Sequence, residues 1–215
     1  MILLITLNEK IDSAILNNLQ KYIVKKIYEK MLNNDIDNHN LFFIQGRAGT
    51  GKTYTTNVII NVLRKCGYKV LVTGTTGIAA TQYEQGMTCH SLFKLKIDKN
   101  VSGNEFKCNV GYGTYRAKEI LESYLIIIDE ISMLTIQTAH DIDYTLRSLV
   151  AHELKNNTNL ENILPFGGKN ILFVGDLLQL PPVIPNSNSS VANKLITNCS
   201  FWPSIKLFGL KDPVR

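Results

Sequence analysis

The sequence predicts an α/β fold in which helices cover both faces of a mostly parallel sheet. Its four expected strands, at residues 41–44, 69–73, 124–128 and 170–174, are apolar over most of their length. Strands that are buried on both faces have this pattern, whereas strands with one solvated face alternate apolar and polar residues. A helix expected over residues 51–66 separates the first two strands, and strands that alternate with helices are typical of a parallel sheet.

The length and composition fit one globular domain with a full hydrophobic core. The chain has 215 residues, of which 45% are hydrophobic and 19% are charged, as in ordinary globular proteins and unlike disordered chains. Its formal net charge of +5 mildly favours a polyanionic partner, although many metabolic enzymes carry a similar excess. The charge alone therefore assigns no function.

The cysteines and the N-terminus bear on the location of the protein. The four cysteines are far apart and form no Cys-x-x-Cys pair, so we expect free or buried thiols in a reducing compartment and no metal cluster. The apolar start is too short for a signal peptide, and no apolar run reaches the length of about 18 residues that a membrane span needs. The sequence predicts a soluble, intracellular protein, without distinguishing nuclear, mitochondrial, cytoplasmic and virus-encoded origins.

Two further regions flank or interrupt the predicted core. Residues 1–40 form an N-terminal helical segment, in which apolar residues recur at helical spacing. The members of that stripe are Ile11, Ile15, Leu19, Ile23, Ile27 and Met31. Residues 94–118 contain several glycines and lack clean periodicity, so we expect an insertion or a long loop there. The domain itself spans residues 41–215.

The strongest functional signal is a glycine-rich octet, GRAGTGKT, at residues 46–53. It matches the pattern Gly-x-x-x-x-Gly-Lys-Ser/Thr and stands between an expected strand and an expected helix, as a phosphate-binding loop (P-loop) requires. Glycines let successive backbone amides point at phosphate oxygens, and the start of the helix adds partial positive charge. The predicted phosphate-binding residues are Gly46, Ala48, Gly49, Thr50, Gly51, Lys52 and Thr53. The alternative is a glycine-rich turn that binds no nucleotide.

Two side chains of the octet and two acids complete a predicted site for a nucleoside triphosphate with magnesium. Lys52 can reach the β- and γ-phosphates, and the Thr53 hydroxyl can bind Mg²⁺. Asp129 and Glu130 follow an apolar strand, at the edge of a parallel sheet where ligands bind. Asp129 would hold the metal, usually through water, and Glu130 would polarise the attacking water as general base. Alone, such an Asp-Glu pair could equally mark the plain end of a strand.

Further blocks of sequence distinguish among proteins with such a loop. Residues 72–80 and 86–93 read VTGTTGIAA and GMTCHSLF, and residues 129–134 read DEISML. Residues 165–170 read PFGGKN, and residues 175–183 read GDLLQLPPV. In this order the blocks resemble those of the superfamily-one DNA helicases of the PIF (petite integration frequency) type. The RecD and Dda helicases, which share the QLPP element but less of the PFGG segment, are the alternative within the superfamily.

The resemblance covers nearly the whole chain and implies a RecA-like first motor domain, domain 1A, over residues 41–215. It implies ATP as the nucleotide, hydrolysis with Mg²⁺, 5′-to-3′ translocation along single-stranded DNA, and unwinding of duplexes. By this likeness Gln179 would sense the γ-phosphate, and Arg215 would be the arginine that lies near the nucleotide. The positions expected along the DNA path are Thr76, Gly77, Thr88, His90 and Pro182.

The DNA assignments have local alternatives. His90 and Ser91 could form a turn or cap whose side chains bond the nearby backbone. Pro182 could simply stiffen the exit from a strand. The basic residues of segment 94–118 could line a DNA channel or only solubilise an insertion. The sequence does not choose between these readings.

The chain departs from the family pattern near both ends. The family's N-terminal Leu-Asn-x-x-Gln glutamine contacts adenine, and comparison with residues 7–11, LNEKI, places Ile11 there. Adenine selectivity could then be reduced or be met by backbone groups. Gln20 is a possible substitute, although it lies several helical turns away. A second RecA-like domain with an arginine finger should follow Arg215 and complete the ATP site. We therefore expect a monomer whose partners are that domain and single-stranded DNA, with no membrane partner. The isolated chain should bind nucleotide but hydrolyse it and unwind DNA poorly.

Two other classes of function are rivals. A nucleotide kinase or GTPase would explain the P-loop but not the GMTCHSLF and QLPPV blocks, and the sequence has no Asn-Lys-x-Asp motif for guanine. A non-catalytic docking domain would fit the isoleucine at the glutamine position. The intact Lys52, Asp129 and Glu130 argue against such a domain. The sequence therefore favours a DNA motor.

Overall fold

The computed structural model describes residues 15–32, 41–95, 110–154, 159–179 and 196–211. Within these ranges the chain forms one sheet of six strands, in the order β3-β2-β4-β5-β1-β6. The strands are β1 (Leu41–Gly46), β2 (Val70–Gly74), β3 (Met87–Thr88), β4 (Leu125–Asp129), β5 (Asn170–Gly175) and β6 (Lys206–Leu210). Every pairing between neighbours is parallel, which confirms the predicted α/β fold.

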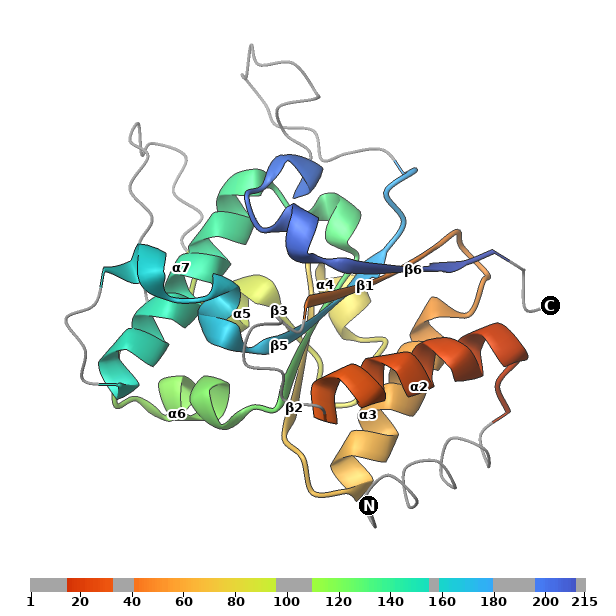
Figure 1. Cartoon of the computed structure of the whole chain (residues 1–215), viewed down its shortest axis with the longest axis horizontal. Helices are drawn as coiled ribbons and strands as arrows, with labels where there is room; N and C mark the ends of the chain where they lie inside the picture. The colour runs from red at the N-terminus through yellow and green to blue at the C-terminus, as the bar shows by residue number, and fades with distance from the viewer. Residues whose placement is uncertain (1–14, 33–40, 96–109, 155–158, 180–195, 212–215) are drawn as a thin grey trace.

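Helices cover both faces of this sheet (Figure 1). They are α2 (Asn18–Leu32), α3 (Lys52–Lys65), α4 (Gly77–Ala80), α5 (Cys89–Phe93), α6 (Tyr115–Glu122) and α7 (Ile136–Glu153). The helices α2 and α3 pack on one face, and α5, α6 and α7 pack on the other with a separate group of buried residues. Short 3-10 turns, among them η1 (Ile131–Met133) and η3 (Pro165–Gly168), join these elements. Among the described helices, none combines the length and apolar character that crossing a membrane requires.

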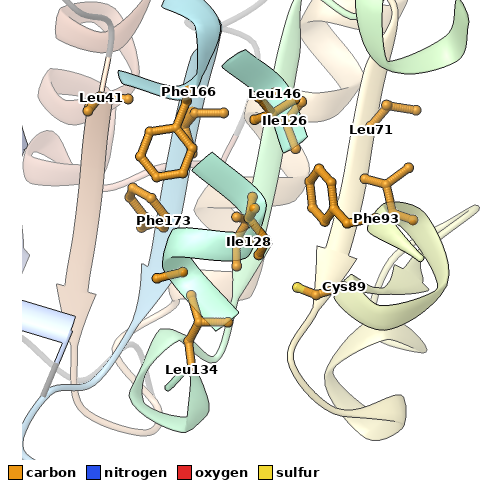
Figure 2. Packing of buried hydrophobic residues seen from close by; sticks show 14 of the residues in the cluster. Leu41, Leu71, Cys89, Phe93, Ile126, Ile128, Leu134, Leu146, Phe166 and Phe173 are labelled. Carbon is orange, nitrogen blue, oxygen red and sulfur yellow. The ribbon is translucent and has the colours of Figure 1, made fainter. Parts of the chain in front are cut away.

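Side chains along the central strands point alternately to the two faces, and both faces are buried. In β1, Phe42 and Ile44 pack with α2 and α3, while Leu41 and Phe43 pack with the helices of the opposite face. Figure 2 shows that opposite face, where labelled side chains of β1, β2, β4 and β5 lie against those of α5 and α7. Because no position of such a strand faces water, the strands appear in the sequence as apolar runs.

The parallel arrangement brings the carboxyl ends of β1, β2 and β4 to one edge of the sheet. β1 runs into the glycine-rich octet, and β4 ends in Asp129, which is in register with Gly74 at the end of β2. A Cβ on Gly74 would come within 2.5 Å of the Ala80 backbone nitrogen, so glycine is required where α4 approaches the strand. The octet and the two predicted acids therefore share one edge of the sheet.

The structure changes several predicted boundaries. The helical segment expected within residues 1–40 is described as the helix Asn18–Leu32, and residues 1–14 and 33–40 lie outside the described ranges. Of the expected insertion at 94–118, residues 96–109 also lie outside them, and the final residues form the first turn of α6. The sequence does not predict β3 and β6, because β3 has only two residues and β6 leaves three of its five residues exposed.

Two of the cysteines belong to the core. Cys89 in α5 and Cys199 are buried, and burial raises the pKa of Cys89 to about 11 and that of Cys199 to about 12. Both thiols are therefore protonated near neutral pH, and neither behaves as a reactive thiolate. In the part of the chain that the structure describes, no group of three or more His, Cys, Asp or Glu side chains could hold a metal ion.

Candidate functional site

The glycine-rich octet forms a tight loop between β1 and α3. Gly49 and Gly51 have φ angles of 80° and 82°, in the left-handed region that favours glycine. A Cβ on Gly46 would come within 2.4 Å of Thr50 Oγ1. The Thr50 hydroxyl donates to the Arg47 carbonyl oxygen at 2.8 Å and closes the loop. The backbone path itself therefore needs the glycines of the motif.

The Lys52 ammonium lies against this loop. Its Nζ donates to the Gly46 carbonyl oxygen at 2.7 Å and to the Arg47 carbonyl oxygen at 3.2 Å. Lys52 is the first residue of α3, and Thr53 follows it in a first turn whose backbone N–H groups have no acceptor within the helix. Positive charge and amide donors thus meet at one point, an arrangement suited to phosphate.

Asp129 is a buried carboxylate with a donor on each oxygen. It is 6% exposed, the Tyr83 hydroxyl donates to its Oδ2 at 2.7 Å, and the Glu130 N–H donates to its Oδ1 at 2.7 Å. Burial raises the pKa of Asp129, while these two hydrogen bonds and the positive charge of Lys52 act in the opposite direction. Lys52 is thus close enough to favour the ionised form of Asp129.

Glu130 stands in a strained turn that its neighbours hold. Its φ of 59° and ψ of 47° are left-handed, which is uncommon for a residue with a side chain and is frequent at functional sites. The Thr75 N–H donates to the Asp129 carbonyl oxygen at 3.1 Å, and the Thr75 hydroxyl donates to the Glu130 carbonyl oxygen at 2.9 Å. The Ser132 hydroxyl donates to Glu130 Oε1 at 3.1 Å. Thr75 therefore holds the backbone of the turn, and Ser132 orients the Glu130 carboxylate.

A cavity of about 670 Å³ lies at this edge of the sheet. Its wall contains most of the predicted phosphate, metal and catalytic residues, namely Ala48, Gly49, Gly51, Lys52, Thr53, Asp129 and Glu130. Gly46 and Thr50 are buried in the loop and do not belong to the wall. Exposed side chains of Tyr54, Ile78 and Met133 add apolar surface to it. Cavities of about 300–1,000 Å³ with a few convergent polar groups are typical of small-ligand sites.

Four of the predicted DNA positions lie in described segments around α4 and α5. The Thr76 hydroxyl caps α4 by accepting from the Ala79 N–H, and Thr76 also lines the cavity. The Thr88 hydroxyl caps α5 by accepting from the Ser91 N–H at 3.1 Å. Gly77 and His90 are exposed. The local capping role that the sequence offers for His90 thus belongs to Thr88.

The remaining predicted residues are not brought to the cavity within the described ranges. Gln179 is exposed, does not line the cavity, and donates its N–H to the Asp176 carbonyl oxygen at 3.1 Å. Pro182, Arg215 and Ile11 lie outside those ranges. Their predicted roles stay predictions.

The N-terminal glutamine position has a second candidate in Gln20. The Leu-Asn-x-x-Gln spacing that residues 7–11 fail to complete is complete at residues 16–20, LNNLQ. There the Gln20 N–H donates to Asn17 Oδ1 at 2.8 Å, and the Asn17 N–H donates to Gln20 Oε1 at 3.0 Å. This reciprocal cap begins α2, which lies beside α3 (Figure 1). Gln20 completes the family spacing, and Ile11, which lies outside the described residues, stays the other candidate for that position.

The contacts of three residues of the site cannot be predicted from the sequence. Thr75 and Ser132 lie inside the blocks VTGTTGIAA and DEISML, but only the folded backbone shows that they bond to Glu130. Tyr83 contacts Asp129 across 46 residues of sequence. Threonine, serine and tyrosine are common residues, so a contact of this kind is found from coordinates and not from a pattern.

Curated relatives of the chain are DNA helicases by name. It is 35% identical over 141 residues to the ATP-dependent DNA helicase Pif1 of Psychrobacter sp. (strain PRwf-1), which covers 66% of this chain and 20% of the relative. It is 31% identical over 182 residues to the ATP-dependent DNA helicase Pif1 of Campylobacter jejuni, which covers 79% of this chain and 35% of the relative. The chain thus spans well under half the length of both relatives.

Solved helicase structures share the fold. Bacteroides Pif1 bound to single-stranded DNA superimposes with a TM-score of 0.68 and 26% identity over 94% of this chain and 43% of that one. Bacteroides Pif1 in complex with ADP-AlF4 gives a TM-score of 0.66 and 27% identity over 89% of this chain and 42% of that one. The fold of this chain is therefore that of the RecA-like domains of Pif1 helicases.

The sequence profile described as PIF1-like helicase matches residues 15–215, which is nearly the whole chain. The match begins just before the LNNLQ segment, and it contains the P-loop and the acids at the end of β4. The chain belongs to the PIF1-like helicase family.

Proposed function

We propose that this chain is the first motor domain, domain 1A, of an ATP-dependent DNA helicase that moves 5′ to 3′ along single-stranded DNA. The observation that carries the proposal is that Lys52, Asp129 and Glu130 line one cavity at the edge of the sheet. The relatives support it, since both are named ATP-dependent DNA helicases. A P-loop kinase or a docking module would leave the family membership unexplained.

Magnesium fits the donors at this site, because Mg²⁺ prefers hard oxygen ligands. The Thr53 hydroxyl and the Asp129 carboxylate, both in the cavity wall, would hold the ion, Asp129 through a bound water. When bound, the ion neutralises charge on the β- and γ-phosphate oxygens. A cation beside Asp129 also favours the ionised carboxylate and so opposes the effect of burial on its pKa.

The proposed chemistry depends on side chains with distinct tasks. Lys52 stabilises negative charge on the γ-phosphate, and Glu130 accepts a proton from the attacking water. The hydrogen bond from Ser132 keeps the Glu130 carboxylate oriented for that transfer. Gln179 is proposed to sense the γ-phosphate, which requires this exposed side chain to approach the nucleotide. Arg215 and a second RecA-like domain are proposed to supply positive charge from the other side.

Single-stranded DNA is proposed to run past α4 and α5. The exposure of Gly77 and His90 supports this path, since a backbone without a side chain and an accessible imidazole suit close contact with DNA. In their capping roles the hydroxyls of Thr76 and Thr88 accept hydrogen bonds, so each keeps its donor hydrogen for a phosphate oxygen. Pro182 is proposed as a further contact.

A DNA-stimulated ATPase assay on the full-length protein tests this function. We expect hydrolysis of ATP to rise when single-stranded DNA is added, because the proposed DNA path includes Thr76, which lines the cavity. DNA affinity should fall with salt at a log–log slope of about −0.7 per neutralised phosphate. In a kinase, ATP turnover would instead rise when a small phosphate acceptor is added. In a docking module, neither DNA nor an acceptor would raise it. A rate of ATP hydrolysis that does not change when single-stranded DNA is added would contradict the helicase proposal.

The base of the nucleotide is proposed to meet Gln20. The Gln20 side chain is 1% exposed, and within the described part of the chain its Nε2 finds no acceptor, while its Oε1 is taken by Asn17. A buried amide donor of this kind is costly unless a ligand supplies an acceptor. Adenine offers ring nitrogens as acceptors, so Gln20 fits the adenine role of the family glutamine.

Replacing Gln20 by alanine is expected to lower the preference for ATP over GTP by a factor of about 2 to 10, because one neutral hydrogen bond contributes about 0.5–1.5 kcal/mol. The measurement is competition of ATP and GTP against a fluorescent nucleotide. The ratio of the ATP and GTP affinities reports base recognition alone. Loss of the α2 cap would lower the affinities for both nucleotides by the same factor and leave that ratio unchanged. Asn18→Ala, at an exposed position of the same turn, is the control and should keep the wild-type ratio. An unchanged ratio in Gln20→Ala would rule out this contact.

A further inference from the structure

Tyr83 lies outside both nucleotide-binding motifs but contacts Asp129, which belongs to one of them. It is 5% exposed, and its hydroxyl donates to Asp129 Oδ2 at 2.7 Å. The residue follows α4, outside the P-loop and outside β4. Its backbone is fixed there, because the Gly86 N–H donates to its carbonyl oxygen at 3.0 Å and a Cβ on Gly86 would come within 2.1 Å of the Ala80 carbonyl oxygen. The phenol therefore reaches Asp129 from a rigid turn.

This hydrogen bond restricts the Asp129 carboxylate. An ionised carboxylate has about four lone-pair sites, and the Tyr83 hydroxyl and the Glu130 N–H occupy one on each oxygen. Rotation of the carboxylate plane would break at least one of these charge-assisted bonds, each of which is 2.7 Å long. Each oxygen of Asp129 keeps a lone pair that can accept from a metal-bound water. The two hydrogen bonds hold the carboxylate plane in one orientation, so these lone pairs point in fixed directions.

The Tyr83 phenol is a stable donor in this position. Burial raises the pKa of Tyr83, and the negative charge of Asp129 raises it further. The hydroxyls of Thr53 and Thr56 lie close enough to act on the same pKa in the opposite direction.

We propose that Tyr83 is a positioning residue for magnesium, whose hydroxyl holds the Asp129 carboxylate in the orientation that receives the metal-bound water. The proposal rests on the ATP-binding function proposed above and adds a residue from outside the sequence motifs. Tyr83 touches neither nucleotide nor metal in this arrangement and acts through Asp129. Hydrogen bonds that orient metal ligands commonly contribute about 10- to 100-fold to metal affinity.

The variant Tyr83→Phe removes the hydroxyl and keeps the buried ring. In the full-length protein we expect the Mg²⁺ concentration for half-maximal binding of a fluorescent ATP analogue to rise about tenfold. The measurement is a titration of magnesium chloride into protein and analogue that have been freed of metal with EDTA. Binding of the analogue before magnesium is added should equal that of the wild type, because the variant leaves Lys52 and the backbone amides of the loop unchanged.

The matched control is Tyr28→Phe. Tyr28 is 2% exposed, and its hydroxyl donates to the Ile59 carbonyl oxygen at 2.8 Å. This variant also loses one buried phenol hydrogen bond, but the acceptor is a backbone carbonyl of α3 and not a carboxylate. We expect its magnesium titration to match that of the wild type.

The outcomes separate the inference from the function on which it rests. Equal magnesium titrations for wild type and Tyr83→Phe would overturn the positioning role. So would equal shifts in Tyr83→Phe and Tyr28→Phe, because they would indicate general loosening of the core. A wild-type protein that binds the analogue without any dependence on magnesium would overturn the proposed function itself, and the inference with it.

Discussion

Replacing Lys52 by alanine is expected to lower the affinity for ATP by a factor of about 10 to 100 and to abolish its turnover. Hydrogen bonds to charged groups contribute about 1.5–3 kcal/mol, and each 1.4 kcal/mol is about tenfold in affinity. Lys52 Nζ lies within 2.7 Å of the Gly46 carbonyl oxygen, so the ammonium already occupies the loop that is proposed to hold the phosphates. The substitution removes that charge without changing the glycines that set the backbone path.

Fluorescence titration with an ATP analogue measures the affinity, and release of phosphate by the full-length protein measures the turnover. The control is Lys65→Ala, which removes an exposed lysine from the opposite end of α3. It lowers the net charge by the same amount, so any effect of charge alone appears in both variants. Equal affinities in Lys52→Ala and wild type would show that nucleotide binds elsewhere.

The core strands and the phosphate-binding loop could be predicted because the burial or backbone conformation of each segment determines which residues that segment itself can contain. Strands buried on both faces are apolar over most of their length, so β1, β2, β4 and β5 appear as nearly continuous apolar runs. The octet can be predicted for a similar reason. Glycine is required by the left-handed backbone at Gly49 and Gly51 and by the close approach at Gly46. The two-residue β3 and the half-exposed β6 satisfy no such demand, and the sequence does not reveal them.

The residues that hold the catalytic groups in place could not be predicted, because their partners are distant in sequence. The bond from Tyr83 to Asp129 and the bond from Thr75 to Glu130 each cross 46 residues or more. Assignment of the adenine-binding glutamine from the sequence is limited by a repeated motif. A Leu-Asn pair starts two nearby segments, and only the segment that ends in Gln20 completes the spacing and forms the cap of α2.

Replacing Glu130 by glutamine is expected to lower kcat for ATP by a factor of about 10² to 10⁴ while the affinity for ATP stays close to that of the wild type. Glutamine keeps the size of the side chain and can still accept a hydrogen bond from Ser132, but it cannot take a proton from water. Because Lys52 and the loop amides are proposed to bind the phosphates, removing the general base should leave binding intact. This separation of binding from turnover distinguishes Glu130→Gln from Lys52→Ala.

The strain at Glu130 sharpens this test. A left-handed backbone at a residue with a side chain costs about 1–3 kcal/mol, so the turn is kept by its surroundings, chiefly the two bonds from Thr75. If Glu130 served only the fold, Glu130→Gly would stabilise the turn and hydrolysis would persist. If Glu130 is the general base, the glycine variant should resist thermal unfolding at least as well as the wild type and still lose turnover as Glu130→Gln does. Persistent turnover in either variant would remove Glu130 from the mechanism.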